Sequence, residues 1–306
     1  MEILRIATRR SALALWQANH VRDLLLQAHP GLEVELVKIV TKGDRILDRP
    51  LAEIGGKGLF LKELEVSMLQ GESDLAVHSM KDMPAEDTPG LVLQAALPRA
   101  NPFDAWLCLS GASLEELPAG ARVGTSSLRR GCQVRAARPD LEVVELRGNV
   151  DTRLAKLDAG EYDAIILAAA GLERLGWGGR ITARLTPPQW LPAGTQGIIG
   201  LQCRTGDEAM VTLLDPLADA GAMRQALAER TVLAALQGSC QVPLAVYAEP
   251  QSDGSLVLEG MVGTPDGKTV LRAEASGDDP ESVGLDLAGQ LKAQGAEAII
   301  ASLSRH

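Results

Sequence analysis

Short apolar runs that suggest strands alternate with amphipathic stretches that suggest helices along most of this chain. The run Glu2–Ala7 is followed by a helical pattern that Ser11 can cap and that extends to Ala28, where His-Pro-Gly at 29–31 ends it. A second strand is predicted at Leu32–Val40. Regular alternation of strands and helices favours an α/β fold, in which the strands form a sheet covered by helices.

The pattern also indicates where the chain passes between domains. Near Pro98–Asp104 it crosses into a second unit, and Ile198–Leu201 is predicted to return to the first, as when two α/β lobes enclose a cleft. The last segment has a helix at about Gly221–Leu236, three strand candidates and a final helix, which is typical of a small α+β domain. We therefore predict three domains: 1–98 with 198–216, then 99–197, then 217–306.

The composition limits which partners this protein is expected to bind and in which compartment it is expected to work. The 306 residues carry a formal net charge of -10, which argues against a broad nucleic-acid or anionic-membrane surface. No apolar run approaches the roughly 20 residues that span a bilayer, and no secretory leader is recognised. The four cysteines show neither metal spacing nor a disulfide framework. We expect a cytoplasmic protein with no nucleic-acid or membrane partner and no metal.

Arginines stand where predicted strands lead into helices. Two of them, Arg129 and Arg130, lie just inside a helix that begins near Ser126, and a helix N-terminus attracts anions. Any single one has about even odds of being a solvated surface residue. As a set they predict a polyanionic small-molecule ligand, because guanidinium forks match carboxylates. The set is Arg9, Arg129, Arg130, Arg147 and Arg153.

The segment His78–Pro84 follows the apolar strand Leu75–Val77. A Lys-Asp pair at a strand end can place the Asp82 carboxylate in a cleft, where it would stabilise positive charge or move protons. On the residues alone, a turn in which Asp82 caps the backbone is the favoured alternative. His78 is expected to be a hydrogen-bonded structural residue rather than a ligand or base.

Two further motifs suggest a lid and a reactive thiol. The Gly-Gly-Lys-Gly stretch at 55–58 is not a Walker loop and fits a mobile lid whose Lys57 reaches an anion. Cys240 lies in a tight turn between a long helix and a strand, and we select it as the reactive cysteine. Cys108 and Cys203 are expected to be small buried side chains, and Cys132 is expected to lie within a helix.

Taken in order, the motifs resemble one family. They are Arg9-x-Ser11, Gly-Gly-Lys-Gly-Leu-Phe at 55–60, Ala-Val-His-Ser-Met-Lys-Asp at 76–82, Gly-Thr-Ser-Ser-Leu-Arg-Arg at 124–130, Leu-Arg-Gly-Asn-Val at 146–150 and Gly-Ser-Cys-Gln-Val-Pro at 238–243. Together they resemble hydroxymethylbilane synthase (porphobilinogen deaminase). The resemblance is dense from Ile6 to Pro243 and thinner beyond.

The resemblance implies a monomeric transferase of heme and porphyrin biosynthesis. Such an enzyme condenses four molecules of its substrate, porphobilinogen, head to tail on an enzyme-bound dipyrromethane, and releases ammonia and linear hydroxymethylbilane. It also implies that the first two domains are similar to the two lobes of periplasmic binding proteins around a cleft. The C-terminal α+β domain would carry the cofactor cysteine.

Residue roles follow from the resemblance. The dipyrromethane cofactor would be held by a thioether to Cys240, and Asp82 would be the catalytic carboxylate that bonds pyrrole nitrogens and stabilises cationic intermediates. Cofactor binding would further involve Lys81, Ser11, Thr125, Ser127, Arg129, Arg130 and Arg147. Substrate binding would involve Arg9, Arg153, Arg174, Gln196, Lys57 and Phe60.

Two departures from the family pattern concern the lid and substrate affinity, namely Glu53 where several members carry lysine and Phe103 where arginine is frequent. Two other functions remain open on the residues alone. One is a non-catalytic two-lobed polyanion-binding module, which would leave Asp82 and Cys240 without a purpose. The other is a transferase that uses Cys240 as a nucleophile in turnover rather than as an anchor.

Overall fold

The computed structural model describes residues 3–41, 61–237 and 242–303, and these divide into two compact units. The first unit holds 3–41, 61–100 and 197–223, and the second holds 101–196 together with the described residues from 224 onward. The further division of the second unit into two domains stays a prediction.

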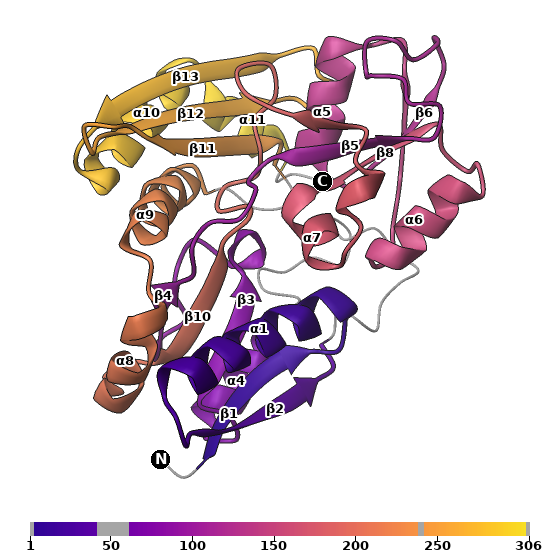
Figure 1. The fold of residues 1–306 in the computed structure, drawn as a ribbon. Helices are drawn as coiled ribbons and strands as arrows, with labels where there is room; N and C mark the ends of the chain where they lie inside the picture. The colour runs from indigo at the N-terminus through magenta and orange to yellow at the C-terminus, as the bar shows by residue number, and fades with distance from the viewer. Residues whose placement is uncertain (1–2, 42–60, 238–241, 304–306) are drawn as a thin grey trace. The chain divides into compact units, whose positions relative to one another are not determined.

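The first unit is built on a five-stranded sheet (Figure 1). Its order is β2-β1-β3-β10-β4, with β1 parallel to β2 and β3, and β10 antiparallel to β3 and β4. The predicted return of the chain is confirmed, because β10 inserts between two strands that precede it by a hundred residues or more. The strands are β1 (Ile3–Arg9), β2 (Glu33–Ile39), β3 (Leu75–Ser79), β4 (Leu91–Ala96) and β10 (Ile199–Arg204).

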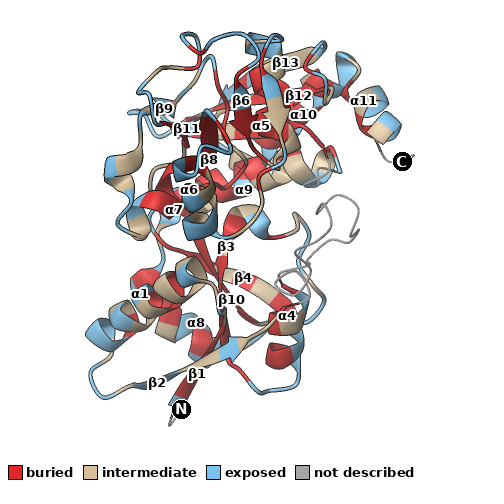
Figure 2. Ribbon diagram, turned by 90° about the vertical axis from the view of Figure 1, so that its right-hand side faces the viewer, coloured by how far each residue is buried: buried red, intermediate tan, exposed pale blue. Residues whose placement is uncertain are grey.

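Helices cover both faces of this sheet. One face packs against α1 (Ala12–Ala28) and α8 (Glu208–Leu214), which bury aliphatic side chains such as Val21 and Leu214. The other face packs against α4 (Lys62–Leu69) through Leu64 and Met68. Because both faces are covered, β3 and β10 are almost wholly buried (Figure 2).

The second unit contains a sheet with the same order and strand directions. Its order is β7-β6-β8-β5-β9, with β6 parallel to β7 and β8, and β5 antiparallel to β8 and β9. The strands are β5 (Asp104–Cys108), β6 (Arg122–Gly124), β7 (Glu142–Val144), β8 (Ala164–Ala168) and β9 (Ala183–Leu185). One face packs on α5 (Leu128–Ala137), and the other on α6 (Val150–Asp158) and α7 (Ala169–Arg174). The α/β prediction is confirmed by this repeated arrangement.

The C-terminal part of the second unit is an antiparallel meander covered by helices. Its strands are β11 (Leu244–Pro250), β12 (Leu256–Gly263) and β13 (Val270–Gly277), and β12 lies between the other two. Their buried side chains pack with those of α9 (Ala220–Ala235), α10 (Pro280–Ala293) and α11 (Ala296–Leu303). Along β13 exposed and less exposed residues alternate, as expected for a sheet with one solvent-exposed face (Figure 2). Among the described residues no helix is long and apolar enough to cross a membrane.

The turn between β12 and β13 lies directly on the backbone of α5. Gly267 has a φ of +71°, and a Cβ at this position would stand 2.6 Å from the Ala136 nitrogen and 2.7 Å from the Cys132 carbonyl oxygen. Beside this contact, the buried side chains of Cys132, Ala245 and Met261 pack together. Helix α5 is therefore held between the second sheet and the C-terminal meander.

We expect Gly267→Ala to lower the free energy of unfolding by about 2 kcal/mol, because the methyl group meets fixed backbone and the φ is left-handed. Gly254→Ala is the matched control. That turn glycine also has a positive φ (+89°), but nothing lies within 4 Å of its Cβ position. Urea unfolding of both variants measures the difference, and equal losses would contradict close packing of the turn on α5.

Candidate active site

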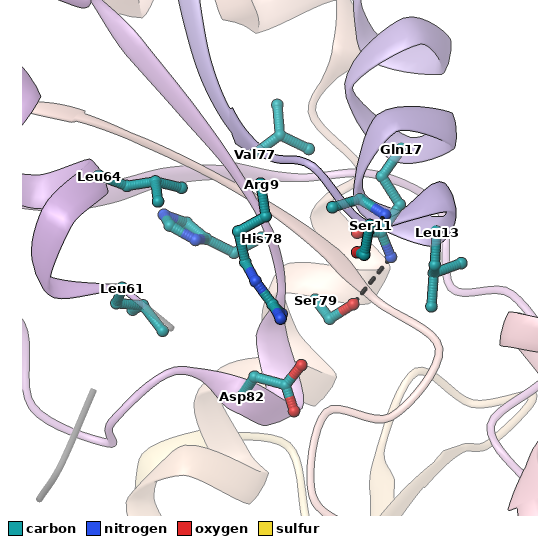
Figure 3. Close-up of a pocket in the computed structure, with 11 residues that line it drawn as sticks. Arg9, Ser11, Leu13, Gln17, Leu61, Leu64, Val77, His78, Ser79 and Asp82 are labelled. Atoms are coloured by element: carbon teal, nitrogen blue, oxygen red, sulfur yellow. Dashed lines mark hydrogen bonds between the residues drawn. The ribbon is translucent and has the colours of Figure 1, made fainter. Parts of the chain in front are cut away.

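A pocket in the first unit lies at the carboxyl ends of β1 and β3 (Figure 3). Arg9 is the last residue of β1, and Ser11 is the N-cap of α1, where its Oγ accepts a hydrogen bond from the Ala14 nitrogen at 3.3 Å. Asp82 ends the short 3-10 turn Met80–Asp82 that follows β3. Parallel strands present their carboxyl ends at one edge of a sheet, and ligands of open α/β sheets gather there. The sequence-predicted residues Arg9, Ser11 and Asp82 are thus brought together.

Hydrogen bonds fix the polar wall of this pocket. Gln17 Nε2 donates to Ser79 Oγ at 2.8 Å and so joins α1 to the end of β3. Asp82 is exposed and makes no hydrogen bond or ion pair with any described residue. Its neighbour Lys81 is half-buried and does not line the pocket. The pocket therefore offers an exposed carboxylate, a guanidinium and several hydroxyl and amide groups.

His78 lines the same pocket, yet only 5% of its surface is exposed. Its Nε2 lies 2.9 Å from Gln202 Oε1, and Gln202 Nε2 donates to Glu65 Oε1 at 3.1 Å. Burial lowers the pKa of His78 to about 4, although the hydrogen bond with Gln202 opposes the shift. The prediction of a hydrogen-bonded histidine is confirmed, and its imidazole is neutral at neutral pH.

In the second unit the sequence-predicted arginines of α5 surround a buried carboxylate, Asp104, which has no exposed surface. Arg129 Nη1 donates to Asp104 Oδ2 at 2.7 Å, and Arg130 donates to Asp104 Oδ1 through Nη2 at 2.7 Å and Nε at 3.1 Å. Two more side chains donate to the same carboxylate, Trp190 Nε1 at 2.8 Å and Gln196 Nε2 at 3.0 Å. All four come from outside β5, the strand that begins at Asp104.

This arrangement sets the charge state of Asp104. Burial alone would raise the pKa of its carboxyl, but the charges and hydrogen bonds of Arg129 and Arg130 hold that pKa well below its usual range. The remaining bonds of the two guanidinium groups go to the carbonyl oxygens of Leu191 and Ile166. Neither arginine is a solvated surface residue, because both guanidinium groups are buried and bonded within the protein.

Arg147 differs from these two. It lies in the turn Arg-Gly-Asn at 147–149, where Gly148 has a φ of +117° and Asn149 caps α6 by accepting from the Thr152 nitrogen at 2.8 Å. A Cβ on Gly148 would stand 2.7 Å from the Thr152 Cβ, so the turn requires glycine. The Nη1 of Arg147 is buried and has no hydrogen-bond partner among the described residues. A buried guanidinium nitrogen in this state suits an anion.

Thr125, Ser127, Arg153 and Arg174 are further predicted residues in the second unit. Thr125 is buried, and its Oγ1 accepts from the backbone nitrogen of Ser127, the N-cap of α5. Arg153 Nε donates to the Gly148 carbonyl oxygen at 2.8 Å. Burial lowers the pKa of Arg174 to about 10, although the charge of neighbouring Glu173 opposes the shift.

The cysteines that the structure describes are all unsuited to nucleophilic chemistry. Cys108, Cys132 and Cys203 are buried free thiols, as predicted for Cys108 and Cys203, and Cys132 lies in α5 as predicted. Burial raises the pKa of Cys132 and of Cys203 to about 11, which suppresses the thiolate. The predicted cofactor residue Cys240 and the predicted lid residues Lys57 and Phe60 lie outside the described residues.

Sequence reasoning missed Asp104 and Gln17. Asp104 directly precedes the apolar run Ala-Trp-Leu-Cys-Leu at 105–109. A carboxylate at the start of a buried strand indicates that cations must surround it. Gln17 sits on the buried side of α1, two turns after the Ser11 cap, where a polar side chain needs a partner.

Comparison with known proteins gives the family. A family model described as porphobilinogen deaminase, dipyrromethane cofactor binding domain, matches residues 4–212, and one for the C-terminal domain of porphobilinogen deaminase matches residues 223–293. The chain belongs to the porphobilinogen deaminase family. A porphobilinogen deaminase of Stenotrophomonas maltophilia (strain K279a) is 57% identical over 98% of this chain and 99% of that protein. One of Xanthomonas axonopodis pv. citri (strain 306) is 56% identical over 99% of this chain and 100% of that protein.

Among solved structures, the methionine-binding protein MetQ is similar over 74% of this chain and 95% of that one, with a TM-score of 0.46 and 12% identity. The cofactor class predicted from the sequence is borne out by the family model, whose description names the dipyrromethane. Of the two other functions left open, the non-catalytic binding module is not favoured by membership in an enzyme family.

We expect Asp104→Asn to lower the free energy of unfolding by about 3–5 kcal/mol, because Arg129 and Arg130 are left buried beside each other without a counter-charge. Asp140→Asn is the matched control, since it removes a carboxylate that pairs with Arg138 at 2.6 Å on the surface, and should cost less than about 1 kcal/mol. Urea unfolding followed by tryptophan fluorescence measures both. Similar small losses would show that Asp104 does not hold the arginines.

We expect the free energy of unfolding to fall as the pH drops from about 6.5 towards 4, because unfolded His78 takes up a proton near pH 6.5 whereas folded His78 stays neutral until about pH 4. This contribution is complete above pH 6.5 and is lost through that window. His78→Gln should remove it, while His20→Gln, at an exposed position of α1, should leave it. An unchanged slope in His78→Gln would contradict the buried neutral imidazole.

Proposed function

We propose that this chain is a hydroxymethylbilane synthase, a transferase that joins four porphobilinogen molecules head to tail, releases ammonia and yields linear hydroxymethylbilane. Family membership supports the activity. The observation that carries the proposal is the first-unit pocket in which the exposed carboxylate of Asp82 lies with the guanidinium of Arg9. Porphobilinogen carries carboxylates and an ammonium group, so a pocket with both signs of charge complements it.

The residues present fit a dipyrromethane cofactor. Such a group carries several carboxylates, and Arg147 Nη1 is a buried donor without a partner among the described residues. It also carries pyrrole N–H groups, and the oxygens of Asp82 are acceptors with no described donor. When bound, the dipyrromethane supplies the carbon end onto which pyrrole units are joined. We propose its thioether at Cys240, because the three described cysteines are buried.

Asp82 is the proposed catalytic residue. Its carboxylate is held at the end of a short 3-10 turn directly after a buried strand, so the backbone fixes its place while the side chain stays exposed. An ionised carboxylate there stabilises positive charge that develops on a pyrrole and can hold a proton released from it. Arg9 is proposed to bind a substrate carboxylate, and Ser11 and Lys81 to bind cofactor groups.

The second unit supplies further proposed cation sites. Two guanidinium groups share the single carboxylate of Asp104, so the start of α5 keeps a net positive charge. We propose that Arg129 and Arg130 bind the cofactor through this charge, together with Arg147, Thr125 and Ser127. The proposed substrate residues are Arg153, Arg174, Gln196, Lys57 and Phe60. The chain is proposed to act as a cytoplasmic monomer. Its net charge of -10 supports the proposed absence of a nucleic-acid or anionic-membrane partner.

The mass of the intact protein tests whether the proposed cofactor is covalently attached at Cys240. We expect the purified chain to exceed its sequence mass by that of two linked pyrrole units, and Cys240→Ser to show no excess. Cys132→Ser is the matched control, and it should keep the excess because that thiol is buried. A wild-type mass that equals the sequence mass, before and after incubation with porphobilinogen, would contradict the proposed synthase.

The turnover number of an Asp82 variant tests the proposed catalytic role of the Asp82 carboxylate. We expect Asp82→Asn to lower kcat by about 100-fold or more, since the neutral amide no longer balances developing positive charge or takes a proton. Glu86→Gln is the matched control, because it removes an exposed carboxylate from the same loop and should leave kcat near the wild-type value. Steady-state formation of hydroxymethylbilane measures both, and equal activities would exclude the proposed role of Asp82.

A further inference from the structure

Helix α1 contributes two polar side chains to the pocket of Arg9 and Asp82. Ser11 is its N-cap, and Gln17 follows on the buried side of the helix, where only 3% of its surface is exposed. The other buried residues of α1 are alanine, valine and leucine. Gln17 is therefore the one buried polar side chain of this helix, every residue of which the structure describes. The proposed function gives it no task.

The amide of Gln17 reaches across to the end of β3. Its Nε2 donates to Ser79 Oγ at 2.8 Å (Figure 3). A buried amide that loses such a bond is left unsatisfied, which costs free energy, so the bond persists while α1 stays packed. An aliphatic side chain would fill the same volume with no polar group to satisfy. What Gln17 adds to the fold is thus a directed link from α1 to Ser79.

Ser79 leads directly into the turn that ends at Asp82. It is the last residue of β3 and the N-cap of the 3-10 turn Met80–Asp82, yet its hydroxyl does not cap that turn. The hydrogen bond from Gln17 holds this hydroxyl instead. The backbone of the turn is held separately, because Met80 N donates to the Ile198 carbonyl oxygen at 3.1 Å. The chain that carries Asp82 therefore starts from a point that is fixed by two different elements.

The start of α1 is also joined to the other side of the pocket. Thr8, which is fully buried, lies next to Arg9 in β1, and its Oγ1 donates to the Ala14 carbonyl oxygen at 3.1 Å. The first turns of α1 are thus bonded to the end of β1 through Thr8 and to the end of β3 through Gln17. These are the two strand ends that carry Arg9 and lead to Asp82.

We propose that Gln17 is a positioning residue that acts through Ser79 to fix the Asp82 carboxylate relative to Arg9. This inference rests on the proposed function. A substrate whose carboxylate is held by Arg9 presents its reacting atoms at a set distance from that guanidinium, so the Asp82 carboxylate must be held at a matching distance. A displacement of about 1 Å can lower a rate by about 100-fold. Because β1 places Arg9 independently, the loss of Gln17 affects the rate and leaves substrate binding in place.

Steady-state kinetics of Gln17→Leu tests this role. The variant keeps a similar volume but removes the donor. We expect kcat per bound dipyrromethane to fall by about 10-fold, with KM within about 2-fold of wild type. Gln27→Leu is the matched control, because Gln27 is exposed on the same helix, and it should keep both values. A merely structural role would lower the midpoint of urea unfolding without changing kcat per dipyrromethane, and that result would overturn the proposal. So would a raised KM with unchanged kcat, which indicates direct contact with substrate.

A second variant shows whether Gln17 acts through Ser79. Ser79→Ala should lower kcat by a similar factor, and the double variant should fall no further, because both changes remove the same bond. Falls that multiply in the double variant would overturn the proposal.

A crystal structure of the Gln17→Leu holoenzyme gives a readout besides turnover. It should show Asp82 displaced while Arg9 keeps its place, and an unmoved Asp82 would overturn the inference alone. Absence of hydroxymethylbilane formation by the wild-type protein would overturn the proposed function and this inference with it.

Discussion

Asp104 stands at the first residue of β5 with no exposed surface, and four side chains donate hydrogen bonds to it: Arg129, Arg130, Trp190 and Gln196. An isolated buried carboxylate costs several kcal/mol, so β5 can begin with an aspartate only where such donors converge. These hydrogen bonds join the first turn of α5 and residues 190–196 to strand β5 of the second sheet. Helix α5 in turn contacts the Gly267 turn of the C-terminal meander.

This constraint divides the arginines into two kinds. Arg129 and Arg130 have an internal counter-charge and carbonyl partners, so their shared positive charge is fixed in place but partly neutralised. Arg147 has a buried nitrogen without a described partner, and Arg9 lies at an exposed carboxylate in the first unit. A buried guanidinium nitrogen like that of Arg147, which a ligand has still to pair, suits a chain of acidic pyrroles, and its fixed position avoids the cost of reordering the side chain on binding.

Much of this was predictable from local patterns. The Ser11 cap of α1, the return of the chain at β10 and the meander at the C-terminus follow from periodicity and turn residues. The start of α5 was predicted near Ser126, and its N-cap is Ser127. Strand β5 is harder to predict because it begins with a charged residue, Asp104. Its partners lie from 25 to 92 residues away, and no local pattern shows that a carboxylate and two arginines so far apart will meet.

We propose that this chain carries a covalently bound pair of pyrroles, whose carboxylates its arginines neutralise and whose nitrogens its acceptors bind. Reaction of the purified, washed protein with Ehrlich's reagent, which colours pyrroles with a free α-position, tests this most directly. Wild-type protein should colour without added porphobilinogen, and the colour should remain with the chain after denaturation and gel filtration. Wild-type protein that stays colourless, or colour that separates from the denatured chain, would show that no pyrroles are covalently bound.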